Sequence, residues 1–251
     1  NINIQDTVNG STALIEACRK EYNQDIAKLL LKYGAKVDIR DNTNHTALMY
    51  CCKKSYPTLV RLLLDKKANM YFTNNTKLTA LHLACERGNK NIVNMLLKEG
   101  SNINEKGGYT GFTPLHIAID VGNINIVKLL IENGSNINDK TSEFDTSLML
   151  ACNTKMDGWG LCNYKIDYTE IIKLLIDMGV NINDKGNHNE TALMRATKTR
   201  KIENIKLLLS KGADVNACNT MGFSSLTYAC QKKNNIDIVK ILLDNGANIN
   251  H

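Results

Sequence analysis

Cysteine and histidine are the residues of this chain whose side chains could do chemistry. The sequence holds eight cysteines and five histidines, residue types that form disulfides, bind metals or transfer protons. The adjacent Cys51 and Cys52 lack a second Cys or His pair at zinc spacing, so we expect no metal. No glycine-rich phosphate loop, H-E-x-x-H or G-x-S-x-G motif occurs, and we expect neither catalysis nor a cofactor.

Most of the cysteines recur at one position of a repeated pattern. Five stand six residues after a Thr or Ser that opens a helix signal, namely Cys18, Cys52, Cys85, Cys152 and Cys230. This is a small, inward-facing helix position, where a free cysteine behaves as a compact hydrophobe. Equivalent residues of neighbouring repeats should lie roughly 10 Å apart, whereas disulfide Cα atoms lie within about 7 Å. We therefore expect reduced thiols and a cytoplasmic or nuclear protein.

A period near 33 residues organises the whole chain. The opening Thr or Ser recurs at intervals of 34, 33, 34, 33, 45 and 33 residues, at Thr12, Thr46, Thr79, Thr113, Thr146, Thr191 and Ser224. Each opening begins two short helix signals with one apolar face. In six repeats a glycine follows the second helix, where a left-handed residue ends a helix well. Lys67 replaces this glycine in the second repeat, and we expect an irregular helix end there.

A short extended finger with polar turn residues follows each pair of helices. Three fingers carry glycine two residues before the opening Thr or Ser. The other four carry Asn44, Lys77, Phe144 and Asn189. We expect less ideal turns in these four fingers.

The fourth repeat resembles the ankyrin repeat nearly position by position. It reads Thr113-Pro114-Leu115-His116-Ile117-Ala118, then Gly122-Asn123 and later Gly134. The resemblance covers the chain in seven repeats, at about 5–38, 39–71, 72–105, 106–138, 139–183, 184–216 and 217–251. It implies one ankyrin repeat domain over residues 1–251, an all-α repeat solenoid of helix-turn-helix pairs with β-hairpin fingers. It also implies that His82 and His116 bond to the backbone of the neighbouring finger.

The 45-residue interval contains an insertion of about a dozen residues near 153–168. It falls in the loop between the two helices of the fifth repeat, so it should not disturb the stack. Trp159, the only tryptophan, lies within it. The side chain either folds back onto neighbouring helices or anchors a partner.

Bulk composition fits a globular protein with enough apolar residues for a core. Hydrophobic residues make up 43%, charged residues 22%, and the formal net charge is +6. No apolar run approaches the roughly 18 residues of a membrane span, and we expect none. The charge is too modest to indicate nucleic-acid binding by itself.

Family resemblance places the residues after the first helix on the inner, concave face, where we expect a partner protein to bind. The candidates are mostly basic: Arg19, Lys20, Lys53, Lys54, Glu86, Arg87, Lys198 and Lys232. Cations at a helix C-terminus also gain roughly 0.3–1 kcal/mol each from the helix dipole. Dipole stabilisation and an acidic partner surface are compatible explanations, and both stay open.

Further candidates occupy the first helices and the fingertips. Tyr50, Arg195 and Tyr228 fall on the first helices, in a row with aliphatic residues of the other repeats. The finger candidates are Tyr109, Phe112, Met221 and Phe223. Aromatic residues beside basic ones suit protein recognition, whereas nucleic acid would favour denser Lys and Arg coverage.

The sequence thus predicts a non-enzymatic protein-interaction scaffold for a partner with acidic or mixed acidic-apolar character. One alternative is a targeting module of a longer polypeptide, and another is nucleic-acid or anionic-lipid binding. The last repeat keeps an internal apolar pattern, so we expect further repeats or another molecule at the ends. The Asn-, Ile- and Lys-rich composition resembles ankyrin proteins of large DNA viruses, intracellular bacteria and protists, for which a host protein is an expected target.

Overall fold

Pairs of short helices, each followed by a finger loop, build the chain. The structure is a computed structural model that describes residues 1–153 and 167–250. The helices are α1 (Ala13–Arg19), α2 (Gln24–Lys32), α3 (Ala47–Lys54), α4 (Pro57–Asp65), α5 (Ala80–Arg87), α6 (Lys90–Lys98), α7 (Pro114–Asp120), α8 (Ile124–Glu132), α9 (Ser147–Cys152), α10 (Thr169–Asp177), the 3₁₀ turn η1 (Asn187–Asn189), α11 (Ala192–Lys198), α12 (Ile202–Ser210), α13 (Ser225–Cys230) and α14 (Ile236–Asp244). This is an all-α repeat solenoid, as predicted.

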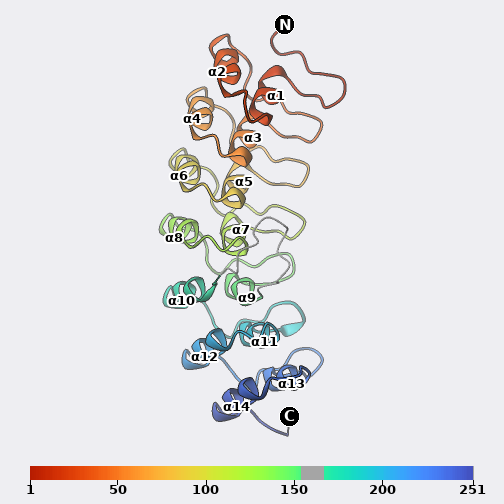
Figure 1. The fold of residues 1–251 in the computed structure, drawn as a ribbon, viewed down its shortest axis with the longest axis vertical. Helices are drawn as coiled ribbons and strands as arrows, with labels where there is room; N and C mark the ends of the chain where they lie inside the picture. The colour runs from red at the N-terminus through yellow and green to blue at the C-terminus, as the bar shows by residue number, and fades with distance from the viewer. Residues whose placement is uncertain (154–166, 251) are drawn as a thin grey trace. The chain divides into compact units, whose positions relative to one another are not determined.

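The chain divides into two compact units. Unit 1 comprises Asn1–Ala118 and Asn125–Ser135, and unit 2 comprises Ile119–Ile124 and Asn136–His251. In unit 1 the first helices α1, α3, α5 and α7 form one row, the second helices form another, and the fingers lie beyond the first row (Figure 1). In unit 2 the first helices α9, α11 and α13 pack in sequence, and α10 packs against α12.

Threonine or serine starts the first helix of each pair. In six pairs its hydroxyl accepts the backbone N–H of the third residue on, at 3.3–3.4 Å, which satisfies one of the free helix N–H groups. In two pairs a histidine ring also takes part: Nδ1 of His82 and Nδ1 of His116 accept the N–H of Thr79 and Thr113, both at 3.1 Å. The recurring Thr-x-Leu therefore marks the helix starts.

His82 also joins its repeat to the next finger. Because Nδ1 is an acceptor, Nε2 carries the proton and faces the carbonyl oxygens of Glu105 at 3.0 Å and Phe112 at 3.1 Å. The ring is fully buried, and burial lowers its pKa to about 4, although these carbonyls favour the protonated form. The predicted bond between His82 and the neighbouring finger is confirmed.

Lys67 ends its helix in the regular way, so the prediction of an irregular end was wrong. Its φ is +61°, in the left-handed region that Gly100 occupies at φ +90° after α6. The hydrogen bonds also correspond: the N–H of Ala68 reaches the carbonyl of Leu63 at 3.0 Å, as the N–H of Ser101 reaches that of Leu96. The closing bonds outweigh the steric cost of a left-handed lysine.

The residue two before the opening Thr or Ser is left-handed in fingers with and without glycine. In the first finger the N–H of Gly10 reaches the carbonyl of Asp6, four residues earlier. Asn44, Lys77, Phe144 and Asn189 have φ between 58° and 61°, close to Gly10 and Gly111. Each donates its N–H to the carbonyl three residues earlier, at 2.8–3.0 Å. The predicted difference in turn geometry is therefore absent. Within the described residues the fingers contain isolated bridges, Gly107 with Phe112 and Lys140 with Thr146, rather than the strands of a hairpin.

Stacking of the repeats builds the core. The leucine of the Thr-x-Leu opening is 1% exposed in the first six pairs: Leu14, Leu48, Leu81, Leu115, Leu148 and Leu193. Cysteines 18, 51, 52, 85 and 152 are buried, and every cysteine of the described residues is free. Cys230 was predicted to face inward, but it is exposed. It lies in the last helix pair, and no later helix in the described chain covers that side.

Candidate protein-binding surface

A row of exposed basic residues follows the first helices of unit 1. Lys20, Lys53, Lys54 and Arg87 are all exposed at the C-terminal ends of α1, α3 and α5, together with the acidic Glu86. None of the four cations has a carboxylate within ion-pair distance among the described residues. We call these four residues the cationic row. Arg19 differs, because it pairs with Glu16 at 2.9 Å.

Tyr50 lies beside the cationic row and supports the base of a finger. Its hydroxyl donates to Oδ2 of Asp41 at 2.7 Å, and its ring stacks on His45 with centroids 5.0 Å apart. Oδ1 of Asp41 accepts the N–H groups of Thr43 and His45, both at 2.9 Å. Burial raises the pKa of Asp41, but the hydrogen bonds from Tyr50 and Thr43 outweigh it and hold the pKa below its usual value.

Backbone hydrogen bonds connect successive fingers of unit 1. Asn42 donates its N–H to Asn9 at 2.8 Å, and Asn75 donates to Thr43 at 3.0 Å. The N–H of Gly108 continues the series to the carbonyl of Thr76 at 2.8 Å. The four fingers therefore form one supported row. Because loops held in this way lose little freedom on binding, they suit a recognition surface.

The four finger candidates differ in exposure. Tyr109 is 88% exposed and Met221 is 64% exposed. Phe112 and Phe223 are half-buried. The ring of Phe112 lies 5.8 Å from that of His116, and Phe223 meets Tyr228 edge-on at 5.7 Å. The two phenylalanines therefore lie at the bases of their fingers, whereas Tyr109 and Met221 project into solvent.

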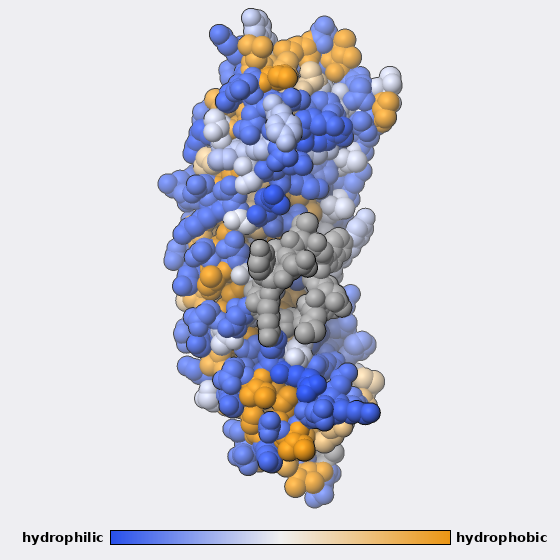
Figure 2. All heavy atoms as spheres, in the orientation of Figure 1, coloured by the Kyte–Doolittle hydropathy of each residue, from blue (hydrophilic) through white to orange (hydrophobic). Residues whose placement is uncertain are grey.

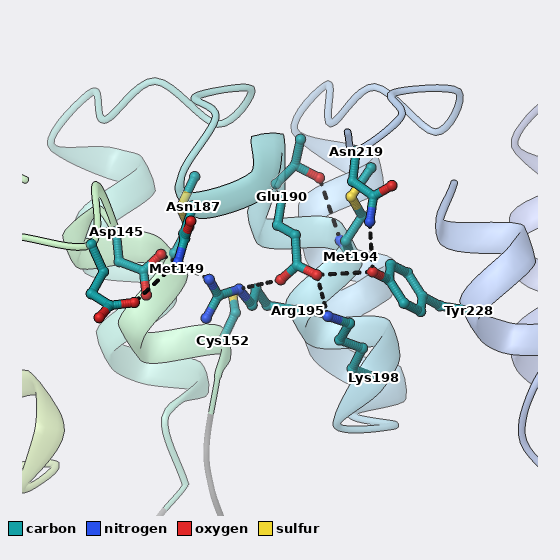
Figure 3. Close-up of polar contacts among 12 residues, drawn as sticks. Asp145, Met149, Cys152, Asn187, Glu190, Met194, Arg195, Lys198, Asn219 and Tyr228 are labelled. Carbon is teal, nitrogen blue, oxygen red and sulfur yellow. Dashed lines mark hydrogen bonds and ion pairs between the residues drawn. The ribbon is translucent and has the colours of Figure 1, made fainter. Parts of the chain in front are cut away.

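The corresponding side of unit 2 carries a buried charge cluster (Figure 3). Nη2 of Arg195 lies 2.8 Å from Oδ1 of Asp145, and its Nε lies 2.8 Å from Oε2 of Glu190. Lys198 pairs with the other oxygen of Glu190, which also accepts the hydroxyl of Tyr228 at 2.9 Å. The side chains of Arg195, Asp145 and Glu190 are only 10–12% exposed. The cluster joins three successive repeats.

The surroundings shift the two carboxylates of this cluster in opposite directions. Burial opposes ionisation of Glu190, but the hydrogen bonds of Lys198 and Tyr228 outweigh it, so the pKa of Glu190 lies below its usual value. For Asp145 burial prevails over the charge of Arg195 and raises the pKa. Lys198 also lies over the ring of Tyr228, 4.3 Å from its centroid. The cluster neutralises its own cations.

A family model for ankyrin repeats matches three stretches of the chain, at residues 1–74, 55–141 and 159–251. The chain belongs to the ankyrin repeat family. The crystal structure of the human ASB11 ankyrin repeat domain superposes with a TM-score of 0.78 over 95% of this chain and 99% of that domain. At 23% identity this likeness concerns the fold.

A viral ankyrin protein shares a shorter stretch. The putative ankyrin repeat protein L92 of Acanthamoeba polyphaga mimivirus is 43% identical over 54 residues, which is 22% of this chain. The match spans 13% of that relative's length. The likeness therefore concerns a local stretch of repeat sequence.

The candidate residues predicted from the sequence differ in how the ankyrin fold exposes them. Lys232 is exposed as expected, whereas Arg195 and Tyr228 lie inside the cluster, and their role as partner contacts stays a prediction. Trp159 lies outside the described residues. The missed residues are the finger-base acceptors, such as Asp41 and Asn219. Their signal was an Asp or Asn five residues before the opening Thr or Ser.

The described part of the chain contains neither a group of metal-ligating residues nor a helix that could span a membrane. No group of three His, Cys, Asp or Glu residues there could hold a metal ion. No described helix is both long and apolar enough to cross a bilayer. The face drawn in Figure 2 is mostly hydrophilic, with hydrophobic residues in separate patches. The candidate functional features are therefore the exposed surface of unit 1 and the charge cluster of unit 2.

Proposed function

We propose that this ankyrin repeat chain is a non-enzymatic scaffold that binds another protein through its first helices and fingers. Ankyrin repeats are in general protein-interaction modules, which supports this class of function. The cationic row is the observation that carries the proposal. Four exposed cations that form no ion pair with the described residues lie beside a supported row of fingers, and such a surface favours an acidic partner.

The fingers would add apolar contacts to this charged surface. Tyr109 projects from a fingertip of unit 1. Met221 projects from a fingertip of unit 2 and would be a separate contact. Aromatic and methionine side chains are enriched at the centres of protein interfaces. Because a viral protein shares part of the sequence, we expect the partner to be a host protein in a reducing compartment of the cell.

Affinity capture with charge-reversed variants tests the proposal. In the test variant Lys20, Lys53 and Lys54 become Glu, and we expect at least a tenfold loss of the captured partner. The matched control changes Lys32, Lys66 and Lys98 to Glu. These lysines are also exposed and lie at the C-terminal ends of the second helices of the first three repeats, so net charge changes equally on another face. Equal capture by both variants would contradict the proposal.

A salt titration separates protein recognition from phosphate binding. Binding of a DNA duplex or an anionic vesicle that depends on the cationic row would weaken steeply as salt rises. We expect negligible binding of either at about 0.15 M salt. Saturable binding of DNA there, lost in the Lys20, Lys53 and Lys54 variant, would favour the nucleic-acid alternative.

A further inference from the structure

A strip of half-buried apolar side chains follows the junction between fingers and first helices in unit 1. We call it the junction strip; its members are His45, Tyr50, Leu78, Phe112 and Ile117. They come from the second, third and fourth repeats, at the residue before the opening Thr and the residue four after it; the first repeat has Ser11 and Glu16 at these positions. Two ring contacts fix the strip, His45 on Tyr50 and Phe112 on His116.

The middle of the junction strip is a single side chain wide. Leu83 occupies the helix position of the third repeat but is only 2% exposed, so Leu78 alone remains accessible there. Leu78 lies against the next finger: a Cβ added to Gly107 would stand 3.0 Å from its Cδ2. The glycine thus leaves room for the leucine at the junction. A bound chain would therefore contact one apolar side chain, Leu78, in this repeat.

The cationic row accompanies the junction strip. Lys53 follows Tyr50 on the same helix. Burial is the main cause that lowers the pKa of His45, and the positive charge of Lys53 lowers it further. Apolar contacts and positive charges therefore lie side by side over α3 and α5.

Repeat spacing determines how a bound chain would meet this surface. Packed helices lie roughly 8–10 Å apart. An extended chain of the polyproline II type rises about 3.1 Å per residue with three residues per turn, so three residues span one repeat and every third side chain faces the same way. An amphipathic helix would instead need a broad stripe, with three or four apolar anchors per two turns. The junction strip offers one or two per repeat, which favours an extended chain.

We infer that unit 1 binds an extended acidic segment of the partner protein, with an apolar side chain at every third residue and carboxylates between them. This inference rests on the proposed function and adds the chemistry and the spacing of the partner segment. The apolar side chains would contact the junction strip, and the carboxylates would face the cationic row.

In unit 2 only the last repeat has this combination, with Phe223 and the exposed Lys232, and its Tyr228 belongs to the charge cluster. In the other two repeats the residue before the opening Thr is Asp145 or Glu190, and Arg195 on α11 pairs with both. Lys198, in the position that Lys53 occupies, is paired with Glu190. An acidic segment would have to displace these internal partners. The segment is therefore assigned to unit 1.

Two labelled peptides test the spacing by fluorescence anisotropy with the full chain. The first is four Leu-Glu-Asp triplets, and the second has the same composition with its leucines at every second residue. We expect the triplet peptide to bind at least tenfold more tightly. Equal affinity for the two peptides, or no measurable binding of either, would overturn the inference.

Variants test the assignment to unit 1. Changing Lys53 and Lys54 to Glu should weaken the triplet peptide at least tenfold, and Phe112→Ser should weaken it comparably. The matched control changes Lys232 and Lys233, exposed at the corresponding place in unit 2, to Glu, and should alter affinity less than twofold. An equal loss in the control would overturn the assignment. Lys53 and Lys54 are exposed, so the charge-reversal test does not depend on replacing a half-buried residue.

The peptide experiment and the capture experiment test two separate claims. Loss of partner capture in the Lys20, Lys53 and Lys54 variant without peptide binding would overturn only the extended acidic segment. Unchanged capture in that variant would overturn the proposed function, whatever the peptides show.

Discussion

Lys67 shows how a single residue can carry backbone strain within a regular repeat. Its side chain has no role in the helix end, because the closing bonds come from the backbone. Six other repeats place glycine here, and glycine has no Cβ to clash in the left-handed region. The lysine is tolerated because its neighbours fix the backbone, and its strain should be measurable.

Replacing Lys67 by Gly should stabilise the protein by about 0.5–1 kcal/mol, because relief of the left-handed strain exceeds the added flexibility of the unfolded chain. Urea unfolding followed by circular dichroism measures the effect. Lys66→Gly is the control: Lys66 has φ −83°, so it gains no relief and should be neutral or destabilising. A lower midpoint for Lys67→Gly than for the wild type would contradict the account.

His82 should make stability depend on pH. Its pKa is about 4 in the folded protein and about 6.5 in an unfolded chain, so the unfolded state binds the proton first as pH falls. Stability is full above pH 6.5 and declines to pH 4, by roughly 3 kcal/mol at most. His82→Asn should remove this part of the decline. The exposed His188→Asn should leave it, and an unchanged slope in His82→Asn would count against the assignment.

The elements of unit 2 are held together at the finger bases as well as through their cores. Glu190 precedes α11, Arg195 and Lys198 lie on α11, and Tyr228 lies on α13. Through Arg195 the cluster also reaches Asp145, which precedes α9. Removing one member leaves buried charge without its partner, which costs more than the net gain of forming the pair.

Glu190→Gln should therefore destabilise the protein by about 2–3 kcal/mol. The effect belongs to the ionised form, because the pKa of Glu190 is lowered in the folded state. Its contribution is present above the usual glutamate pKa and is lost as pH falls through the folded value. Thermal unfolding at neutral and acidic pH measures this. Glu203→Gln, in an exposed pair with Lys206, should change stability by less than about 0.5 kcal/mol.

At the scale of the whole molecule, the main helix contacts of the described residues run between neighbouring repeats within each unit. The first helices contact one another in order along each unit, so stability should be close to a sum of repeat and interface contributions. A core change should then act locally. This is unlike a globular domain with one shared core.

Leu81→Ala tests this locality. The side chain is 1% exposed, so its truncation should cost about 2–5 kcal/mol. Hydrogen exchange should accelerate most in α5 and its neighbours α3 and α7, and least in α11 to α14. Leu193→Ala, at the same position of unit 2 and equally buried, should give the opposite distribution. A uniform acceleration in both variants would contradict nearest-neighbour coupling.

The sequence by itself determined the repeat, the helix positions and most of the core. These follow from apolar spacing and from the opening Thr, which act within one repeat of about 33 residues. It also located the cationic row, because exposed lysines at helix ends depend on local pattern alone. Even the bond from His82 to the next finger followed from the family resemblance.

Only the tertiary structure decided which neighbours these residues meet. Arg195 has the same sequence signal as an exposed inner-face cation, yet two carboxylates, one from the preceding repeat, enclose it. Cys230 shares the position of Cys18 and is exposed because no later repeat covers it in the described chain. The physical reason is common to both: pairing and burial depend on contacts between repeats, which the pattern of a single repeat does not contain.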